Sequence, residues 1–246
     1  MYPVVKMTYY GKGCYEVHRE VKQKLQGRPP ERGKIKMQSK KSLLRLMFLM
    51  QATEVEFKSM ITFTYPKHYP MDGNIVKLDI GAVLQKVRRE EWQYLWFLEF
   101  QKRGAPHFHL LVTADVITPK MRVDFGLHWT ARIALREWYT QACPPDEYMA
   151  EVLKMAKFNT HYSSWELIRD ADGARNYVAK YAGKERQKRV PARYASVGRF
   201  WGASRGLKPK GLTFDVTEKE VEQWLVDHKH PSTSYELVPR YIWQYG

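Results

Sequence analysis

The chain has 246 residues, of which 44% are hydrophobic and 14% aromatic. This is the composition of a globular protein and argues against a largely disordered chain. No apolar run is long enough to span a membrane, and the first residues lack the apolar stretch of a secretory signal. Two cysteines without a CxxC pair exclude a disulfide scaffold and a thiolate zinc site, so we expect a reducing, cytoplasmic environment.

The charge of the chain is strongly positive: 41 lysines and arginines face 26 acidic residues, for a formal net charge of +15. Such an excess favours a polyanionic partner, because neutralising phosphates releases their counterions. The basic residues gather in two runs, within 19–45 and 180–210. The alternatives are a solvated basic surface or attraction to anionic lipid, but no amphipathic membrane helix or lipidation motif accompanies the charge. We therefore expect nucleic acid as the partner and no membrane.

Caps, turn residues and hydrophobic periodicity predict elements of both kinds along the chain. After a basic and aromatic arm over residues 1–40, we expect helices at 39–50, 78–91, 125–141, 174–182 and 217–227. We expect strands at 60–65, 94–100, 107–113 and 163–168. Because the strands and helices are mixed irregularly, the pattern predicts an α+β fold.

His107-Phe108-His109 is the sharpest local signal. Residues two apart on a strand project from the same face, so both imidazoles can address one point while Phe108 anchors the strand in a core. Neutral imidazoles are good ligands for divalent cations. Two outward-facing histidines on an edge strand would give the same pattern.

Glu99 lies on the preceding predicted strand, across a loop of hairpin length. It can lie opposite His107, with the turn centred on Arg103, or opposite His109, with the turn centred on Gly104. Both registers put the carboxylate on the histidine face. One carboxylate and two imidazoles with open positions suit Mn or Mg, with zinc as an alternative. A Glu99–Arg103 or Glu99–histidine pair without a metal is the competing interpretation.

Tyr177 and Tyr181 are spaced i and i+4 on a predicted helix, so both phenols can point into one site, with Lys180 at their edge. A phenol is a weak nucleophile at its usual pKa of about 10, and nearby cations favour the phenolate. Paired tyrosines on an amphipathic helix are otherwise core or rim residues.

Three stretches together resemble the HUH endonucleases, specifically the rolling-circle replication initiators (Rep proteins) of phages and plasmids. The strand of 60–65, the stretch of 99–111 and the helix segment of 177–181 are similar to the first, second and third motifs of that family in order and spacing. The resemblance implies a central antiparallel sheet with flanking helices in a nuclease domain of residues 41–212, followed by an accessory segment of 213–246 with a short helix.

The resemblance also implies a reaction. A tyrosine attacks a phosphodiester of single-stranded or hairpin origin DNA, and leaves a 5′-phosphotyrosine link and a free 3′-hydroxyl. Glu99, His107 and His109 would hold the metal, Tyr177 and Tyr181 would be the nucleophiles, with Tyr177 cutting first, and Lys180 would stabilise the phenolate or the phosphate. A host helicase and polymerase would be partners, in the host cytoplasm if a phage encodes the protein, since the sequence has no GxxxxGK[ST] loop.

We expect the DNA backbone to contact basic residues of the hairpin loop and of the stretch after the nucleophile helix. These are Arg103, Lys184, Arg186, Lys188, Arg189, Arg193, Arg199 and Arg205. Two other functions remain open. A transposase or mobilisation relaxase shares the chemistry but differs in its DNA target, whereas a non-cleaving DNA-binding regulator would lack a metal ligand or the tyrosines.

Overall fold

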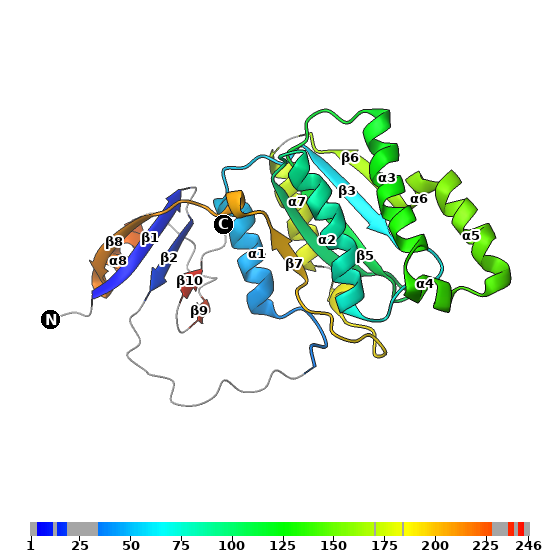
Figure 1. Cartoon of the computed structure of the whole chain (residues 1–246). Coiled ribbons are helices and arrows are strands. Elements are labelled where there is room, and N and C mark those ends of the chain that lie inside the picture. The colour runs from blue at the N-terminus through cyan, green and yellow to red at the C-terminus, as the bar shows by residue number, and fades with distance from the viewer. Residues whose placement is uncertain are drawn as a thin grey trace. The chain divides into compact units, whose positions relative to one another are not determined.

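The structure is a computed structural model, and it describes most of the chain. The described residues are 4–11, 14–18, 34–169, 171–183, 185–227, 236–238 and 241–243. The chain forms two compact units (Figure 1). The larger unit consists of Gly33–Leu44 and Val55–Leu207, and the smaller of Met1–Arg32, Arg45–Glu54 and Lys208–Gly246. None of the helices in the described ranges is both long and apolar enough to cross a membrane.

The larger unit is built on a five-stranded sheet in the order β6-β3-β5-β4-β7, in which every pair of neighbours is antiparallel. Its strands are β3 (Ser59–Thr64), β4 (Tyr94–Phe100), β5 (Pro106–Val112), β6 (Ser163–Leu167) and β7 (Trp201–Ala203). The predicted α+β fold with a central antiparallel sheet is therefore confirmed.

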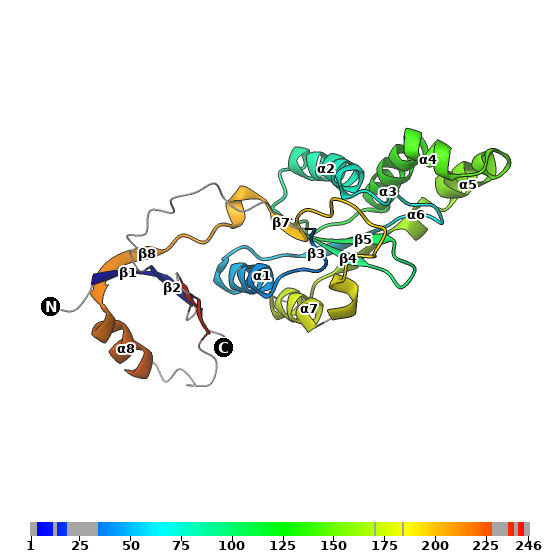
Figure 2. The same ribbon diagram turned by 90° about the horizontal axis from the view of Figure 1, so that it is seen from below.

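Helices lie on both faces of this sheet (Figure 2). Two of them, α2 (Gly73–Arg89) and α3 (Pro119–Ala134), cover one face, and α7 (Ala171–Gly183) lies on the other. The shorter elements are α4 (Glu137–Ala142), α5 (Pro145–Lys157), α6 (Asn159–Tyr162), and the 3₁₀ turns η1 (Glu185–Lys188) and η2 (Arg205–Leu207).

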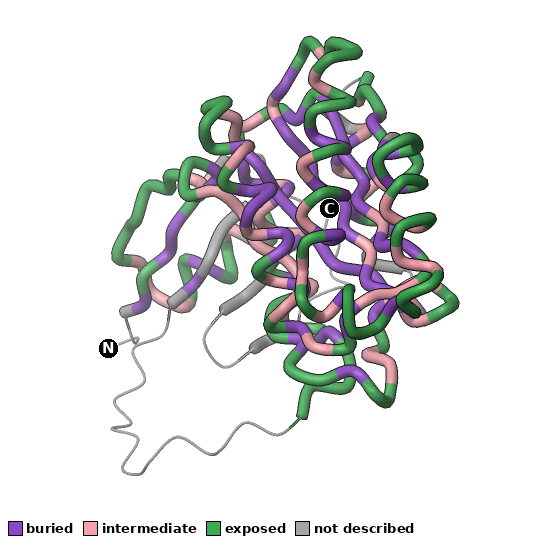
Figure 3. Tube along the Cα trace, turned by 45° about the vertical axis from the view of Figure 1, so that its right-hand side comes forward, coloured by how far each residue is buried: buried purple, intermediate pink, exposed green. Residues whose placement is uncertain are grey.

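The main hydrophobic core fills the space between the sheet and the two helices α2 and α3. Buried strand side chains alternate with the residues of the opposite face, and they pack against apolar residues of the helices (Figure 3). The core includes Ile61, Phe63, Leu98, Phe108, Val76, Ile80, Phe125 and Trp129. Since Phe108 is buried in this core, its neighbours His107 and His109 must face the side on which α7 lies.

The hairpin between β4 and β5 has the first of the two predicted registers, with Glu99 directly opposite His107. Its turn closes with hydrogen bonds from the Gln101 amide to the Ala105 carbonyl (2.9 Å) and from the Gly104 amide to the Gln101 carbonyl (2.8 Å). Gly104 has a φ of 85°, a conformation that side-chain-bearing residues rarely adopt. The glycine thus allows the tight turn that fixes which residues face each other across the hairpin.

Most predicted elements are present, with shifted boundaries. Helix α2 begins at Gly73 rather than at residue 78, because the Asp72 side chain caps it by accepting a hydrogen bond from the Asn74 amide (2.9 Å). The single helix expected at 125–141 is two helices, since α3 ends at Ala134 and α4 begins at Glu137. Helix α5 was not predicted.

The smaller unit contains a three-stranded sheet in the order β2-β1-β8. Strands β1 (Val4–Gly11), β2 (Cys14–His18) and β8 (Leu212–Thr217) are followed by helix α8 (Glu218–Asp227), and β9 (Glu236–Val238) pairs with β10 (Tyr241–Trp243). Val5, Met7, Val17 and Val221 form its small core. The start of the chain, expected to be an arm, thus forms a hairpin that pairs with β8, and only the C-terminal helix matches the expectation.

Helix α1 (Lys40–Ala52) begins in the larger unit and ends in the smaller one. Its first turn is capped as predicted, since the Ser42 amide donates to the Ser39 hydroxyl oxygen (3.2 Å).

Candidate active site

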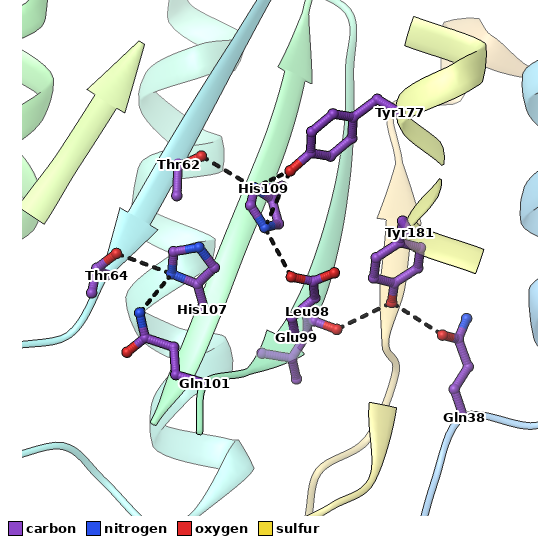
Figure 4. Close-up of polar contacts among 10 residues, drawn as sticks. All are labelled: Gln38, Thr62, Thr64, Leu98, Glu99, Gln101, His107, His109, Tyr177 and Tyr181. Carbon is purple, nitrogen blue, oxygen red and sulfur yellow. Dashed lines mark hydrogen bonds and ion pairs between the residues drawn. The ribbon is translucent and has the colours of Figure 1, made fainter. Parts of the chain in front are cut away.

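A polar patch lies in the otherwise apolar face of the sheet that α7 covers (Figure 4). It is formed by Glu99 of β4, His107 and His109 of β5, and Thr62 and Thr64 of β3. The side chains share a face because each strand places alternate residues on one side, and the registers align them across three strands.

The carboxylate and one imidazole of the patch are in direct contact. Glu99 Oε2 lies 3.2 Å from His109 Nε2, and only 3% of Glu99 is exposed. The Gln187 amide of η1, oriented so that its nitrogen faces the carboxylate, donates to both oxygens of Glu99 (2.9 and 3.1 Å). These contacts solvate a buried carboxylate that would otherwise be costly among Phe97, Leu98 and Phe100.

Two threonine hydroxyls hold the imidazoles from the neighbouring strand. Thr62 Oγ1 lies 3.1 Å from His109 Nδ1, and Thr64 Oγ1 lies 3.0 Å from His107 Nδ1. Each threonine is directly opposite its histidine in the β3–β5 register. An imidazole engaged at Nδ1 has Nε2 as its remaining nitrogen, which is how histidine ligands are commonly oriented towards a metal.

Tyr177 reaches this patch from α7. Its hydroxyl oxygen lies 3.1 Å from Nδ1 and 3.5 Å from Nε2 of His109 (Figure 4). Burial raises the pKa of the Tyr177 phenol, and the negative charges of Glu99 and Glu166 raise it further. The expected lowering of this pKa by cations is therefore not found in the protein by itself, where the neutral phenol is favoured.

Tyr181 does not share this arrangement, which corrects the expectation that both phenols point into one site. Its side chain is 0% exposed, and its hydroxyl donates to the Leu98 carbonyl (3.1 Å) and to Gln38 Oε1 (3.0 Å). The Phe97 ring packs against it at 4.5 Å between centroids. Its i+4 position continues the helix face, but one turn further on, that face meets the buried edge of β4 and the segment of Gln38.

Lys180 lies on the exposed side of α7 and makes no hydrogen bond or ion pair with any residue in the described ranges. Its expected role beside the phenol therefore finds no contact that supports it. Of the three helix residues predicted for catalysis, only Tyr177 meets the polar patch.

The donor set suits a divalent cation, although the protein by itself does not form a closed cage. Within the described ranges, no three His, Cys, Asp or Glu side chains lie close enough to be a preformed metal cluster. Glu99 and His109 are in contact, and the His107 ring is 4.6 Å from the His109 ring between centroids. One carboxylate oxygen and two imidazoles on one face fit a cation that completes its shell with substrate and water.

Comparison with known families assigns the chain. The family model of the replication-associated protein ORF2 matches residues 58–186, slightly more than half of the chain. The chain belongs to this family of replication-associated proteins. The match spans β3, the β4–β5 hairpin and α7, which carry the three motifs. It confirms the resemblance to replication initiators.

Other comparisons add little to this family assignment. No curated protein matches the chain. Among solved structures, the N-terminal nuclease domain of non-structural protein 1 of minute virus of mice is similar, with 12% identity and a TM-score of 0.28. The similarity covers 52% of this chain and 73% of that one. That viral domain coordinates Zn²⁺ in its active-site pocket and recognises DNA at the origin of replication. With so low a TM-score, the assignment rests on the family match.

The basic residues expected to bind DNA have different surroundings in this replication-associated protein. Four of them, Arg189, Arg193, Arg199 and Arg205, are exposed. Lys188 is only 3% exposed, and its ammonium group lies 5.1 Å from the centre of the Tyr181 ring. Lys188 therefore packs inside the protein rather than on the expected DNA-binding surface. Lys184 and the side chain of Arg186 lie outside the described residues.

Arg103 also differs from the expectation, because its guanidinium group is bound to the protein. It donates to the carbonyls of Tyr65 and Pro66, the latter at 2.6 Å, and it lies over the Tyr69 ring at 5.0 Å. These contacts tie the hairpin loop to the chain that leaves β3. Arg103 thus positions the hairpin that carries Glu99 and the histidines.

Two partners of the active-site residues were not predicted from the sequence. The threonines at 62 and 64 have the same two-residue spacing as the histidines at 107 and 109, and this shared period was the available signal. Gln187 lies in a 3₁₀ turn after α7, where no periodic pattern indicates which way its amide points.

Proposed function

We propose that the protein initiates rolling-circle replication by nicking and rejoining single-stranded DNA at an origin, with Tyr177 as the nucleophile. The observation that carries the proposal is the 3.1 Å contact between the Tyr177 hydroxyl and His109, next to Glu99. It brings the third motif of the sequence onto the second, although 68 positions separate the two residues. Membership of the replication-associated family supports the biological role.

In the proposed reaction, the Tyr177 phenolic oxygen bonds to phosphorus and the bond from phosphorus to the 3′ oxygen breaks. The phenolic proton leaves Tyr177, and the departing 3′ oxygen takes up a proton to become a hydroxyl. The 5′ end remains attached to Tyr177 as a phosphotyrosine. Because this link retains the energy of a phosphodiester, a 3′-hydroxyl can later attack it and close the strand without ATP.

Glu99, His107 and His109 would hold a divalent cation, Mn or Mg. When bound, such a cation withdraws electron density from a phosphate and stabilises negative charge on its oxygens. The protein's own contribution is to orient the parts. Thr62 and Thr64 hold the imidazoles at Nδ1, and His109 lies against the Tyr177 hydroxyl. The closed apolar surroundings of the phenol restrict water, which would otherwise compete as the attacking group.

A single nucleophile is favoured over alternation between two tyrosines. Tyr181 is enclosed, and both of its hydroxyl contacts are to the protein. A second cut after a round of synthesis would then require a second protein molecule or the reuse of Tyr177. We propose origin DNA as the substrate, with a host helicase to unwind the duplex and a polymerase to extend the 3′-hydroxyl.

The test is incubation with a single-stranded oligonucleotide that carries the origin hairpin, with Mn²⁺, followed by denaturing gel electrophoresis. We expect a covalent protein–DNA species that EDTA prevents and that is lost in Tyr177→Phe. A noncovalent complex of unchanged affinity in Tyr177→Phe would show that this variant is folded. If wild-type protein binds the DNA but forms no covalent species with Mn²⁺, Mg²⁺ or Zn²⁺, the proposal is wrong.

A further inference from the structure

A short segment before α1, which we call the strap (residues 34–38), runs antiparallel to residues 188–192. Met37 pairs with Arg189 in an antiparallel bridge. The Gln38 amide donates to the Lys188 carbonyl (3.3 Å), and the Val190 amide donates to the Lys36 carbonyl (2.8 Å). The strap therefore joins the two basic runs of the sequence, which are distant along the chain, into one surface.

The outward side of this surface is basic and partly apolar. Lys34, Lys36, Arg189 and Arg193 are exposed, and none of them forms an ion pair with a residue that the structure describes. Lys34 donates to the Ala192 carbonyl (3.1 Å), which holds its side chain over the second strand. Between the lysines, Ile35 and Met37 remain 42% and 41% exposed. Exposed aliphatic side chains interspersed with cations match the alternation of base and phosphate along an unpaired strand.

The strap lies next to the candidate active site. From its last residue, Gln38 accepts a hydrogen bond from Tyr181, one helical turn beyond Tyr177 (3.0 Å). On the paired segment, Gln187 contacts Glu99 and precedes Lys188 and Arg189 directly. A strand of DNA whose phosphate reaches Tyr177 can thus continue onto this surface without crossing a region of acidic side chains.

We propose that the strap and residues 189–193 together form a binding surface for the single-stranded DNA on which Tyr177 acts. The proposal rests on the function proposed above and specifies where the strand runs. Lys34, Lys36, Arg189 and Arg193 contact phosphates, and Ile35 and Met37 contact the faces of unstacked bases. The surface does not read sequence, since it offers cations and aliphatic groups rather than donors and acceptors arranged against base edges.

The experiment measures the affinity of Tyr177→Phe protein for a fluorescein-labelled single strand by fluorescence anisotropy over a range of salt concentrations. Tyr177→Phe is the background in every arm, so that cleavage does not interfere. The test variant is Lys34→Ala/Lys36→Ala. The matched control is Lys154→Ala/Lys157→Ala, which removes two exposed lysines from α5.

We expect the test variant to bind roughly tenfold more weakly at low salt, and the slope of log affinity against log salt to fall by about 1.4, at about 0.7 for each phosphate contact to a single strand. The control should match the background protein. Lys34→Arg/Lys36→Arg should restore binding. Affinity and slope equal to those of the control would overturn the proposal, and so would an equal loss of binding to duplex DNA or to anionic phosphatidylserine vesicles.

Lys36→Ala alone covers the case in which loss of the Lys34–Ala192 contact loosens the strap, because the Lys36 pairing in the strap uses only its backbone. This variant should lose about half of the effect on the salt slope, and an unchanged slope would overturn the proposal. The covalent assay separates the two proposals. If no covalent species forms but the strap variants bind weakly, the nicking function fails and this surface stands. If the species forms and the strap variants bind normally, only the surface is wrong.

Discussion

The Tyr177 hydroxyl lies 3.1 Å from Nδ1 of His109, so that the helix of the third motif meets the strand of the second. The packing of Phe97 explains why only this tyrosine arrives there. The Phe97 ring lies 5.9 Å from the Tyr177 ring and 4.5 Å from the Tyr181 ring, measured between centroids. It wedges the helix so that Tyr181 is enclosed while Tyr177 reaches over the polar patch.

Tyr181→Phe should retain DNA cleavage and lose stability. The variant lacks a hydroxyl that donates to the Leu98 carbonyl and to Gln38, which costs about 1 kcal/mol for a buried hydrogen bond. Urea denaturation measures the loss, and the covalent-adduct assay measures activity. Loss of the adduct in a variant that remains folded would show that Tyr181 takes part in the chemistry.

Thr62→Val should weaken the binding of Mn²⁺ about tenfold to a hundredfold, because residues that orient a histidine ligand typically contribute that much. Valine has the shape of threonine but cannot engage His109 Nδ1. Titration followed by the electron paramagnetic resonance of free Mn²⁺ gives the affinity. Thr62→Ser should restore most of it, and Thr213→Val in the smaller unit is the matched control. Unchanged affinity in Thr62→Val would show that the hydroxyl does not position the ligand.

Arg103→Ala should destabilise the hairpin without changing the salt dependence of DNA binding. The guanidinium group donates to the Tyr65 and Pro66 carbonyls, so its removal should cost about 1–3 kcal/mol in the free energy of unfolding. Thermal denaturation and anisotropy titrations with single-stranded DNA measure the two effects. A shallower salt slope together with unchanged stability would instead make Arg103 a phosphate contact.

Lys77 gives the protein a pH-dependent stability. Burial lowers the pKa of its ammonium group to about 7, and the group lies over the Trp96 ring at 4.7 Å. The unfolded chain keeps this proton up to about pH 10.4, so between about pH 7 and 10 the unfolded state binds more protons and stability rises with pH. Below pH 7 the full cost of the buried charge is present.

Lys77→Met should therefore be more stable than the wild type at pH 6, by a few kcal/mol, and the difference should shrink to near zero by about pH 10. Urea denaturation at a series of pH values measures this difference. Lys120→Met, at an exposed position of α3, is the control. A constant difference across the series would mean that Lys77 has an ordinary pKa in the folded protein.

The sequence predicts the parts of this site better than their assembly. The period of two in β5 placed His107 and His109 on one face, and the short hairpin limited Glu99 to two registers, of which the structure has one. Local spacing cannot say how α7 sits on the sheet, so the inward turn of Tyr181 was not predictable from i and i+4 alone. The pairing of residues 34–38 with 188–192 joins distant segments by backbone hydrogen bonds and leaves no side-chain pattern.

The central claim, that Tyr177 is the nucleophile, is tested most directly by mapping the covalent adduct on wild-type protein. Trypsin cleaves after Arg175, Lys180 and Lys184, so the two tyrosines fall on separate peptides. After reaction with the origin oligonucleotide and Mn²⁺, nuclease and trypsin digestion, mass spectrometry should find the phosphonucleotide on the peptide of residues 176–180. The same mass on the peptide of residues 181–184 would contradict the account.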